Sequence, residues 1–343
     1  MGLVSKLFSC AAGAAAALAL APLSDAVAET SLKVVLPFSF QGALGNWTLA
    51  ESDGCYKRNG LAVAIDGGHG SGDALSKVAA GAYDIGIADF TTLLTFDAQP
   101  NAPGLIAVYI MADRAPTSIV TLKKSGIAKP VDLAGKRIGD NVGEASRELF
   151  PAFAAANSID AKTVSWINVA ANLRETSLLR GEFDAAAGPM FTITSGLHAI
   201  GVKDEEITVF PYAENGVDFF GNAVIVKPAF AASHGDALKS FLTCAVDGMK
   251  GAIANPKAAV DSLKPHNSML DERQALAELQ FSNGFSILTP NIKANGFSAV
   301  DPTRLDRLLG LFAEAYGFPK PAAEKVWNSS YLPPKAERMV GGT

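Results

Sequence analysis

The chain has little clustered positive charge and little histidine. Its 343 residues carry a formal net charge of −5 at pH 7, and the densest basic spot is the pair Lys123 and Lys124. A negative balance without a larger Lys/Arg cluster argues against binding to nucleic acid or to anionic lipid surfaces. The histidines stand at positions 69, 198, 234 and 266. Because they show no metal-ligand spacing, no zinc site is expected.

Motifs for nucleotide binding and for nucleophilic catalysis are also missing. The segment 70–72 reads Gly-Ser-Gly, but the dinucleotide fingerprint needs a further glycine where Leu75 stands. The nucleophile elbow fails at the same place, because His69 occupies its first glycine position. We therefore expect no cofactor, no metal and no catalytic residue.

Long apolar runs are absent beyond the N-terminus. Lys6 precedes an apolar stretch at 7–20, which is followed by Pro22 and the small-residue motif 26–28. The stretch is shorter than the roughly 20 residues of a membrane span, and this order of features is typical of a cleaved export signal. We expect cleavage after Ala28 and export of the mature chain. A retained N-terminal anchor is the alternative.

Cysteine is scarce, with 3 residues in the chain. Cys10 lies in the export signal, which leaves Cys55 and Cys244 in the mature chain. An oxidising compartment would allow them to form a disulfide, but the sequence does not place them within bonding reach. Because free cysteine behaves as a small hydrophobic residue, we expect two separate buried thiols.

The stretch 65–95 carries the strongest positive signal. A strand at 62–65 runs into the glycine-rich turn 67–72, a helix is expected over 73–80, and a second strand at 84–88 ends at Asp89. Open α/β sheets bind ligands beyond the carboxyl ends of their strands, and helix N-termini offer unpaired N–H donors there. The stretch therefore predicts one wall of a ligand-binding crevice.

The alternation of strand, loop and helix recurs along the chain and predicts two α/β lobes. The chain leaves the first lobe near Pro116 and returns near Phe219, which predicts two crossing strands that act as a hinge. A single helix is expected over 143–156. We expect lobe I over 29–116 and 220–343, lobe II over 117–219, and a tail, 319–334, that returns to lobe I.

Five segments in order give the chain a resemblance to a known family. They are 54–63, 79–86, 132–139, 178–185 and 331–334. Together they resemble the periplasmic solute-binding proteins of ABC importers of the nitrate/taurine/alkanesulfonate type, which also includes binders of thiamine pyrimidine precursors. Cys55 replaces the usual aromatic residue. The resemblance covers essentially the whole mature chain.

The resemblance implies a type II periplasmic-binding-protein fold, with two α/β lobes joined by a two-strand hinge. It also implies a non-enzymatic receptor in the periplasm that binds a small molecule, passes it to an ABC permease at the inner membrane and acts as a monomer. The resemblance also implies a set of ligand-binding residues, to which we add His69 because it lies in the expected crevice. The full set is Ser39, Phe40, Gln41, His69, Ser71, Gly72, Asp89, Phe90, Glu144, Ser146, Met190 and Asp218.

The ligand expected from these residues is a small organic anion, such as a sulfonate or a carboxylate. Serine hydroxyls and helix N-termini suit an oxyanion, while Phe40, Phe90 and Met190 would form apolar walls. A thiamine-precursor ligand is an alternative, although the segment 188–191 lacks the acid that such binders present. The sequence also allows a sensory receptor, or a secreted hydrolase or lyase that uses Asp89 or Glu144.

Overall fold

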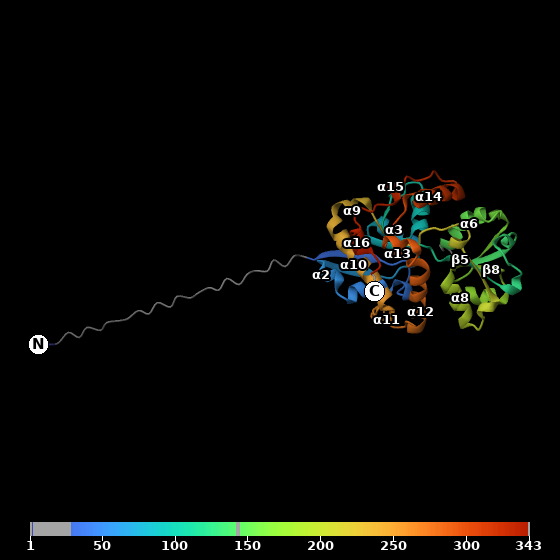
Figure 1. The fold of residues 1–343 in the computed structure, drawn as a ribbon, viewed down its shortest axis with the longest axis horizontal. Coiled ribbons are helices and arrows are strands. Elements are labelled where there is room, and N and C mark those ends of the chain that lie inside the picture. The colour runs from blue at the N-terminus through green and yellow to red at the C-terminus, as the bar shows by residue number, and fades with distance from the viewer. Residues whose placement is uncertain (1, 3–28, 142–144, 342–343) are drawn as a thin grey trace.

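The computed structural model describes residues 2, 29–141 and 145–341, and two five-stranded sheets form the frame of this part of the chain (Figure 1). The first sheet has the strand order β2-β1-β3-β10-β4, and the second has the order β7-β6-β8-β5-β9. The strands of the first sheet are β1 (Thr30–Val35), β2 (Leu61–Asp66), β3 (Ile85–Asp89), β4 (Ile106–Ile110) and β10 (Asn222–Val226). Those of the second are β5 (Thr117–Leu122), β6 (Arg137–Asp140), β7 (Ser165–Asn168), β8 (Ala185–Pro189) and β9 (Ile207–Pro211).

In each sheet, one strand runs against the others. Strand β10 is antiparallel to β3 and β4, and β5 is antiparallel to β8 and β9. These are the strands that the chain enters after it crosses from the other sheet. The remaining neighbours, β1 with β2 and β3, and β6 with β7 and β8, are parallel. The structure confirms the predicted α/β fold of two lobes.

The helices have these bounds: α1 (Gly45–Ser52), α2 (Cys55–Arg58), α3 (Ser71–Ala80), α4 (Phe90–Asp97), α5 (Ala145–Glu148), α6 (Phe150–Ala156), α7 (Arg174–Arg180), α8 (Met190–Ala199), α9 (Pro228–Ser233), α10 (Gly235–Ala254), α11 (Pro256–Asp261), α12 (Glu272–Ser282), α13 (Pro290–Asn295), α14 (Pro302–Tyr316), α15 (Ala323–Val326) and α16 (Lys335–Arg338). The single helix predicted over 143–156 is wrong, because α5 and α6 are separate. Pro151 lacks an N–H group and stands in the first turn of α6, where proline is tolerated. No described helix has the length and apolar character of a membrane span.

Apolar cores lie on both faces of the first sheet. In β10, Ala223 and Ile225 belong to one core, whereas Val224 and Val226 belong to the other. This alternation follows from the period of two along a strand, and burial of both faces explains why strands such as β4 are continuous apolar runs. Helices α3, α4 and α14 pack in one core, and α1, α2 and α10 pack in the other.

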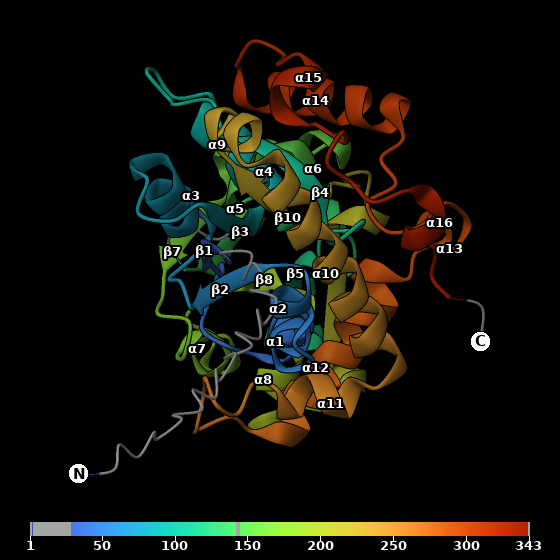
Figure 2. The same cartoon turned by 90° about the vertical axis from the view of Figure 1, so that its left-hand side faces the viewer.

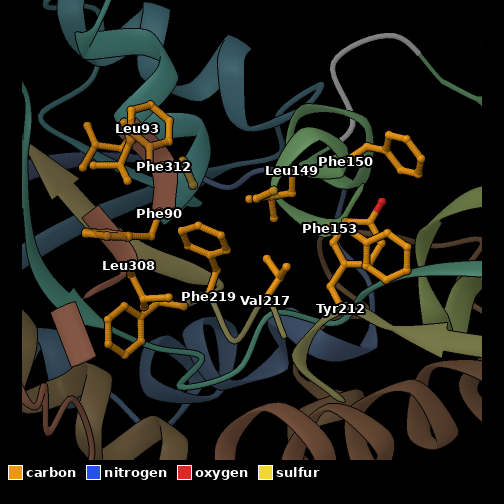
Figure 3. Packing of buried hydrophobic residues seen from close by; sticks show 14 of the residues in the cluster. Phe90, Leu93, Leu149, Phe150, Phe153, Tyr212, Val217, Phe219, Leu308 and Phe312 are labelled. Atoms are coloured by element: carbon orange, nitrogen blue, oxygen red, sulfur yellow. The ribbon is translucent and has the colours of Figure 1, made fainter. Parts of the chain in front are cut away.

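The apolar core continues from one lobe to the other. Figure 3 shows Phe90 and Phe312 on the side of α4 and α14, with Phe219 and Val217 leading towards Phe153 of α6. All five residues are almost fully buried. The lobes are therefore packed against each other along this side.

The two segments that connect the lobes are paired through their backbones. The N–H of Gly221 donates to the carbonyl of Ala112 at 2.9 Å, and the N–H of Ala115 donates to the carbonyl of Phe219 at 2.9 Å. The N–H of Met111 donates to the carbonyl of Asn222, also at 2.9 Å. These bonds make the two crossings the predicted two-strand hinge.

The C-terminal tail returns to the first lobe, as predicted. Trp327 forms a parallel bridge with Ala107 of the edge strand β4, and the N–H of Asn328 donates to the Ala107 carbonyl at 2.9 Å. Farther on, α16 lies beside α13 (Figure 2), where the N–H of Phe297 donates to the Arg338 carbonyl at 2.8 Å. The tail thus covers an edge that would otherwise be open to pairing.

The expectation of two separate thiols is wrong. Cys55 and Cys244 form a disulfide, with their Cα atoms 5.7 Å apart. Cys55 begins α2 and Cys244 lies in α10, and both helices pack in the same core. The sequence alone could not show this, because the pairing depends on how segments 189 residues apart meet.

We predict that replacing both Cys55 and Cys244 by serine lowers the free energy of unfolding of the protein without residues 1–28. A disulfide that closes a loop of this length restricts the unfolded chain, and its loss typically costs about 2–5 kcal/mol. Chemical denaturation measures the change. Thiol alkylation of the denatured, unreduced wild type is the control, and labelling of both cysteines there would contradict the pairing.

Candidate ligand-binding site

A cavity of about 120 Å³ lies between the two sheets. It is formed where the carboxyl ends of β3 and β8 meet the hinge, α5, the start of α8 and helix α12, as expected for a crevice in an α/β protein. The residues that line it are Phe38, Gln41, Ala43, Leu44, Ser71, Asp89, Met111, Ala112, Pro116, Thr117, Ala145, Ser146, Pro189, Thr192, Asn222, Glu278, Ser282 and Ser286.

Asp89 carries a buried carboxyl group at the end of β3, and the residue is 7% exposed. It caps α4, since its Oδ1 accepts the N–H groups of Thr91 at 2.8 Å and Thr92 at 3.2 Å. Its own N–H donates to the Ser71 hydroxyl at 2.9 Å, which joins the start of α3 to the end of β3. Burial raises the pKa of Asp89 to about 7, although the two N–H bonds oppose the rise.

Glu278 of α12 supplies a second carboxyl group to the cavity. Its Oε2 accepts the N–H of Gly42 at 3.0 Å. Burial raises the pKa of Glu278 to about 7, against the effect of this hydrogen bond. Our sequence reasoning missed this residue. The sequence feature that could have identified Glu278 is its position on the same helix face as Ala275 and Leu279, the buried residues of α12. A glutamate among the buried positions of an amphipathic helix is unusual.

Three residues that line the cavity have a buried hydroxyl group without a hydrogen-bond partner among the described residues. They are Thr117 and Ser146 of lobe II and Ser286 of lobe I, and they are 5%, 0% and 2% exposed. Ser286 lies in a π-helical turn, Asn283–Ile287, that follows α12. Such turns often occur at functional sites. A buried hydroxyl without a partner costs free energy, so these groups are suited to contact a bound solute.

The structure brings four of the predicted site residues to the cavity: Gln41, Ser71, Asp89 and Ser146. The glycine-rich turn does not present all of its backbone donors there. The N–H groups of Gly68 and Gly70 donate instead to the carbonyls of Phe38 at 3.1 Å and Pro37 at 2.6 Å. The turn therefore supports the loop after β1, and Ser71 is its contact with the cavity.

The other predicted residues do not line this cavity. Ser39 and His69 are exposed, and Gly72 is half-buried. Phe40 stacks on His266 with ring centroids 4.5 Å apart. Phe90 lies edge-on to Phe220 in the core, Met190 is half-buried at the start of α8, and Glu144 lies outside the described residues. No group of three or more His, Cys, Asp or Glu side chains among the described residues is placed to hold a metal.

Asp218, predicted as a ligand contact, takes part in an ion-pair cluster at the hinge. Arg304 of α14 reaches Asp113 on one crossing at 2.8 Å and Asp218 on the other at 3.2 Å. Its guanidinium also lies over the ring of Phe220, 4.2 Å from the centroid. Because one side chain holds both crossings, this cluster positions the hinge.

Comparisons with known proteins agree with this architecture. The model of the NMT1/THI5-like family matches residues 45–259. A protein of Legionella pneumophila named 4-amino-5-hydroxymethyl-2-methylpyrimidine phosphate synthase is 21% identical over 215 residues, which are 63% of this chain and 67% of that protein.

Solved structures of solute-binding proteins share the fold. The alkanesulfonate-binding protein SsuA of Xanthomonas axonopodis, bound to MOPS, has a TM-score of 0.64 at 15% identity, covering 88% of this chain and 98% of that one. The nitrate-binding protein NrtA of Synechocystis has a TM-score of 0.65 at 9% identity, covering 88% and 87%. The likeness confirms the periplasmic-binding-protein fold.

We predict that the ligand-free protein loses stability as the pH rises from about 4 to about 7. The folded carboxyl groups of Asp89 and Glu278 keep their protons to about pH 7, whereas unfolded carboxyls release theirs near pH 4. The stability from these protons is therefore present at low pH and lost as the pH passes through the folded pKa. Each unit of pKa difference corresponds to about 1.4 kcal/mol.

Unfolding free energies measured across this pH range test the prediction. Asp89→Asn and Glu278→Gln should each show a smaller fall than the wild type. Glu272→Gln, on the exposed start of α12, is the matched control and should behave like the wild type. Equal pH dependence in all four proteins would contradict the assignment.

Proposed function

The chain belongs to the NMT1/THI5-like family, and we propose that it is the solute-binding component of an ABC importer. In this proposal the mature chain acts as a monomer in the periplasm, binds a small polar solute between its lobes and delivers it to a permease in the inner membrane. In this proposal, the described residues within 29–116 and 220–343 form lobe I, and those within 117–219 form lobe II.

The observation that carries the proposal is the set of buried, unpartnered hydroxyls on residues that line one cavity from both lobes. Thr117 and Ser146 come from lobe II, and Ser286 comes from lobe I. A solute that bonds to all three would favour the arrangement in which the lobes are together, because it binds that arrangement more tightly. The paired crossings provide a hinge for such closure.

The charge of the cavity affects the choice of solute. The sequence favours a small organic anion, and hydroxyl groups do suit oxyanions. However, the lining residues include Asp89 and Glu278 and no Lys, Arg or His. We therefore propose a small polar solute, without assigning its charge from the hydroxyl groups.

An enzyme on the same fold is the second candidate, since a relative is named as a synthase of a pyrimidine phosphate. Asp89 and Glu278, with pKa values raised to about 7, are in the range that suits proton transfer at neutral pH. Incubation of the purified protein with each solute that it binds distinguishes the two candidates. Product formation would favour the enzyme.

A thermal-shift screen tests the receptor proposal directly. We predict that at least one compound among sulfonates, carboxylates, nitrate, pyrimidines, amides and amines raises the melting temperature, and that the rise grows with the logarithm of its concentration above Kd. Binding to the folded state contributes about 2.7 kcal/mol at a concentration of 100 times Kd. If every class leaves the melting temperature unchanged, the receptor proposal is wrong.

Removing an unpartnered hydroxyl should affect the melting temperature and the solute affinity differently. Ser146→Ala and Ser286→Ala should leave the ligand-free melting temperature unchanged or higher, because each removes an unsatisfied buried group. Each should weaken binding of a solute found in the screen by about twofold to tenfold, the value of one hydrogen bond.

Ser262→Ala is the control for these variants. Its hydroxyl is buried but lies 2.7 Å from both the Thr48 hydroxyl and the Ala259 carbonyl. Its removal should therefore lower the melting temperature and leave solute affinity unchanged. Loss of stability without loss of affinity in Ser146→Ala and Ser286→Ala would show that the two hydroxyls have a structural role only.

A further inference from the structure

The interlobe cavity is acidic. Asp89 and Glu278 stand among its lining residues, and no basic side chain accompanies them in the described part of the chain. The two carboxyls come from distant segments, β3 and α12, and each is anchored by backbone N–H groups, from Thr91 and Thr92 in one case and Gly42 in the other. Their positions are therefore defined by the fold.

Three arginines of the described chain stand outside the set of lining residues and contact other groups. Arg114 lies over the ring of Phe285, 5.2 Å from its centroid, and Arg147 lies over Trp166 at 5.1 Å. Arg174, 1% exposed, pairs with Glu175 at 3.0 Å. Above pH 7, where both carboxyls are ionised, an anion in the cavity would meet two carboxylates with no cation among the lining residues, and like charges in close proximity are unfavourable.

We propose that the cavity binds a small ligand through a protonated nitrogen, of the ammonium or amidinium type, held by the carboxylates of Asp89 and Glu278. The proposal rests on the receptor function and specifies its ligand class. Nitrogen-bound protons donate strong hydrogen bonds to carboxylates, and the hydroxyl oxygens of Thr117, Ser146 and Ser286 can accept further ones. Pairing with a cation also offsets the cost of burying the two charges.

The cavity, at about 120 Å³, is smaller than the pockets of about 300–1,000 Å³ that bind drug-sized ligands, so small probes suit it. Two series of small planar compounds match this scale and vary in charge at nearly constant shape. One is acetamidinium, acetamide and acetate; the other is guanidinium, urea and nitrate.

The experiment compares these six probes at pH 8, where both carboxyls are ionised, and at equal low millimolar concentrations. Thermal shift and calorimetry measure binding to the protein lacking residues 1–28. The cation of each series should raise the melting temperature most, and the anion should not raise it. Glu278→Gln and Asp89→Asn should each weaken cation binding by about tenfold or more, as expected for loss of a charged hydrogen-bond partner.

The carboxamide variants keep an oxygen that can accept the N–H bonds of Gly42, Thr91 and Thr92, and their melting temperatures without probe verify folding. Glu272→Gln, on the exposed start of α12, should bind the cations like the wild type. Unchanged cation binding in both cavity variants would overturn the proposal.

Stabilisation by the anion or the neutral member alone would overturn the ligand class and leave the receptor function standing. If none of the six probes binds, the ligand class is wrong. The receptor function then depends on the wider solute screen, so the two failures are distinguishable.

Discussion

Backbone pairing between the two crossing segments is the constraint on which the cavity depends. The pairing of the crossings extends into the first sheet. There the N–H of Phe90 donates to the Gly221 carbonyl at 3.1 Å, and Asp89 is paired with Asn222. The end of β3 is thereby tied to the hinge. Arg304 adds a side-chain tie to both crossings, so the floor of the cavity is held by main-chain geometry and by one largely buried guanidinium.

Contacts across the cleft explain why the cavity is small. Phe191 of α8 stacks on Phe281 of α12, with centroids 5.3 Å apart. In addition, Glu148 of α5 lies 3.4 Å from the hydroxyls of Thr92 and Thr95 on α4. The lobes thus meet on each side of the lining residues. Pockets for drug-sized ligands have volumes of about 300–1,000 Å³, and the much smaller space here is consistent with a closed arrangement of the lobes.

Short-range patterns in the sequence predicted the framework well. The strand expected at 62–65 is Leu61–Asp66, and the helix expected at 73–80 is Ser71–Ala80. These elements follow from apolar periodicity and glycine positions, which are local properties. Ser71 and Asp89 were predicted at the crevice for the same reason, since each lies where a strand or turn meets a helix.

The remaining features depend on contacts between distant segments, which periodicity cannot reveal. Cys244 meets Cys55 through the packing of α10, Asp218 meets Arg304 of α14, and Glu278 meets the loop after β1. In each case a C-terminal helix supplies one partner. The resemblance placed Asp218 in a loop near the cleft. In the structure its carboxylate pairs with Arg304, which α14 brings to the hinge.

The acidity of the cavity follows from one close approach between the N-terminal and C-terminal parts of lobe I. A Cβ atom at Gly42 would lie 1.9 Å from the carbonyl oxygen of Ala275, so only glycine allows α12 to pack this closely on the loop after β1. The same approach lets the Gly42 N–H reach Glu278 and holds that carboxyl at the cavity wall. A single glycine in the N-terminal loop therefore sets the position of a charge contributed by a helix more than two hundred residues later, and with it the electrostatic character of the site.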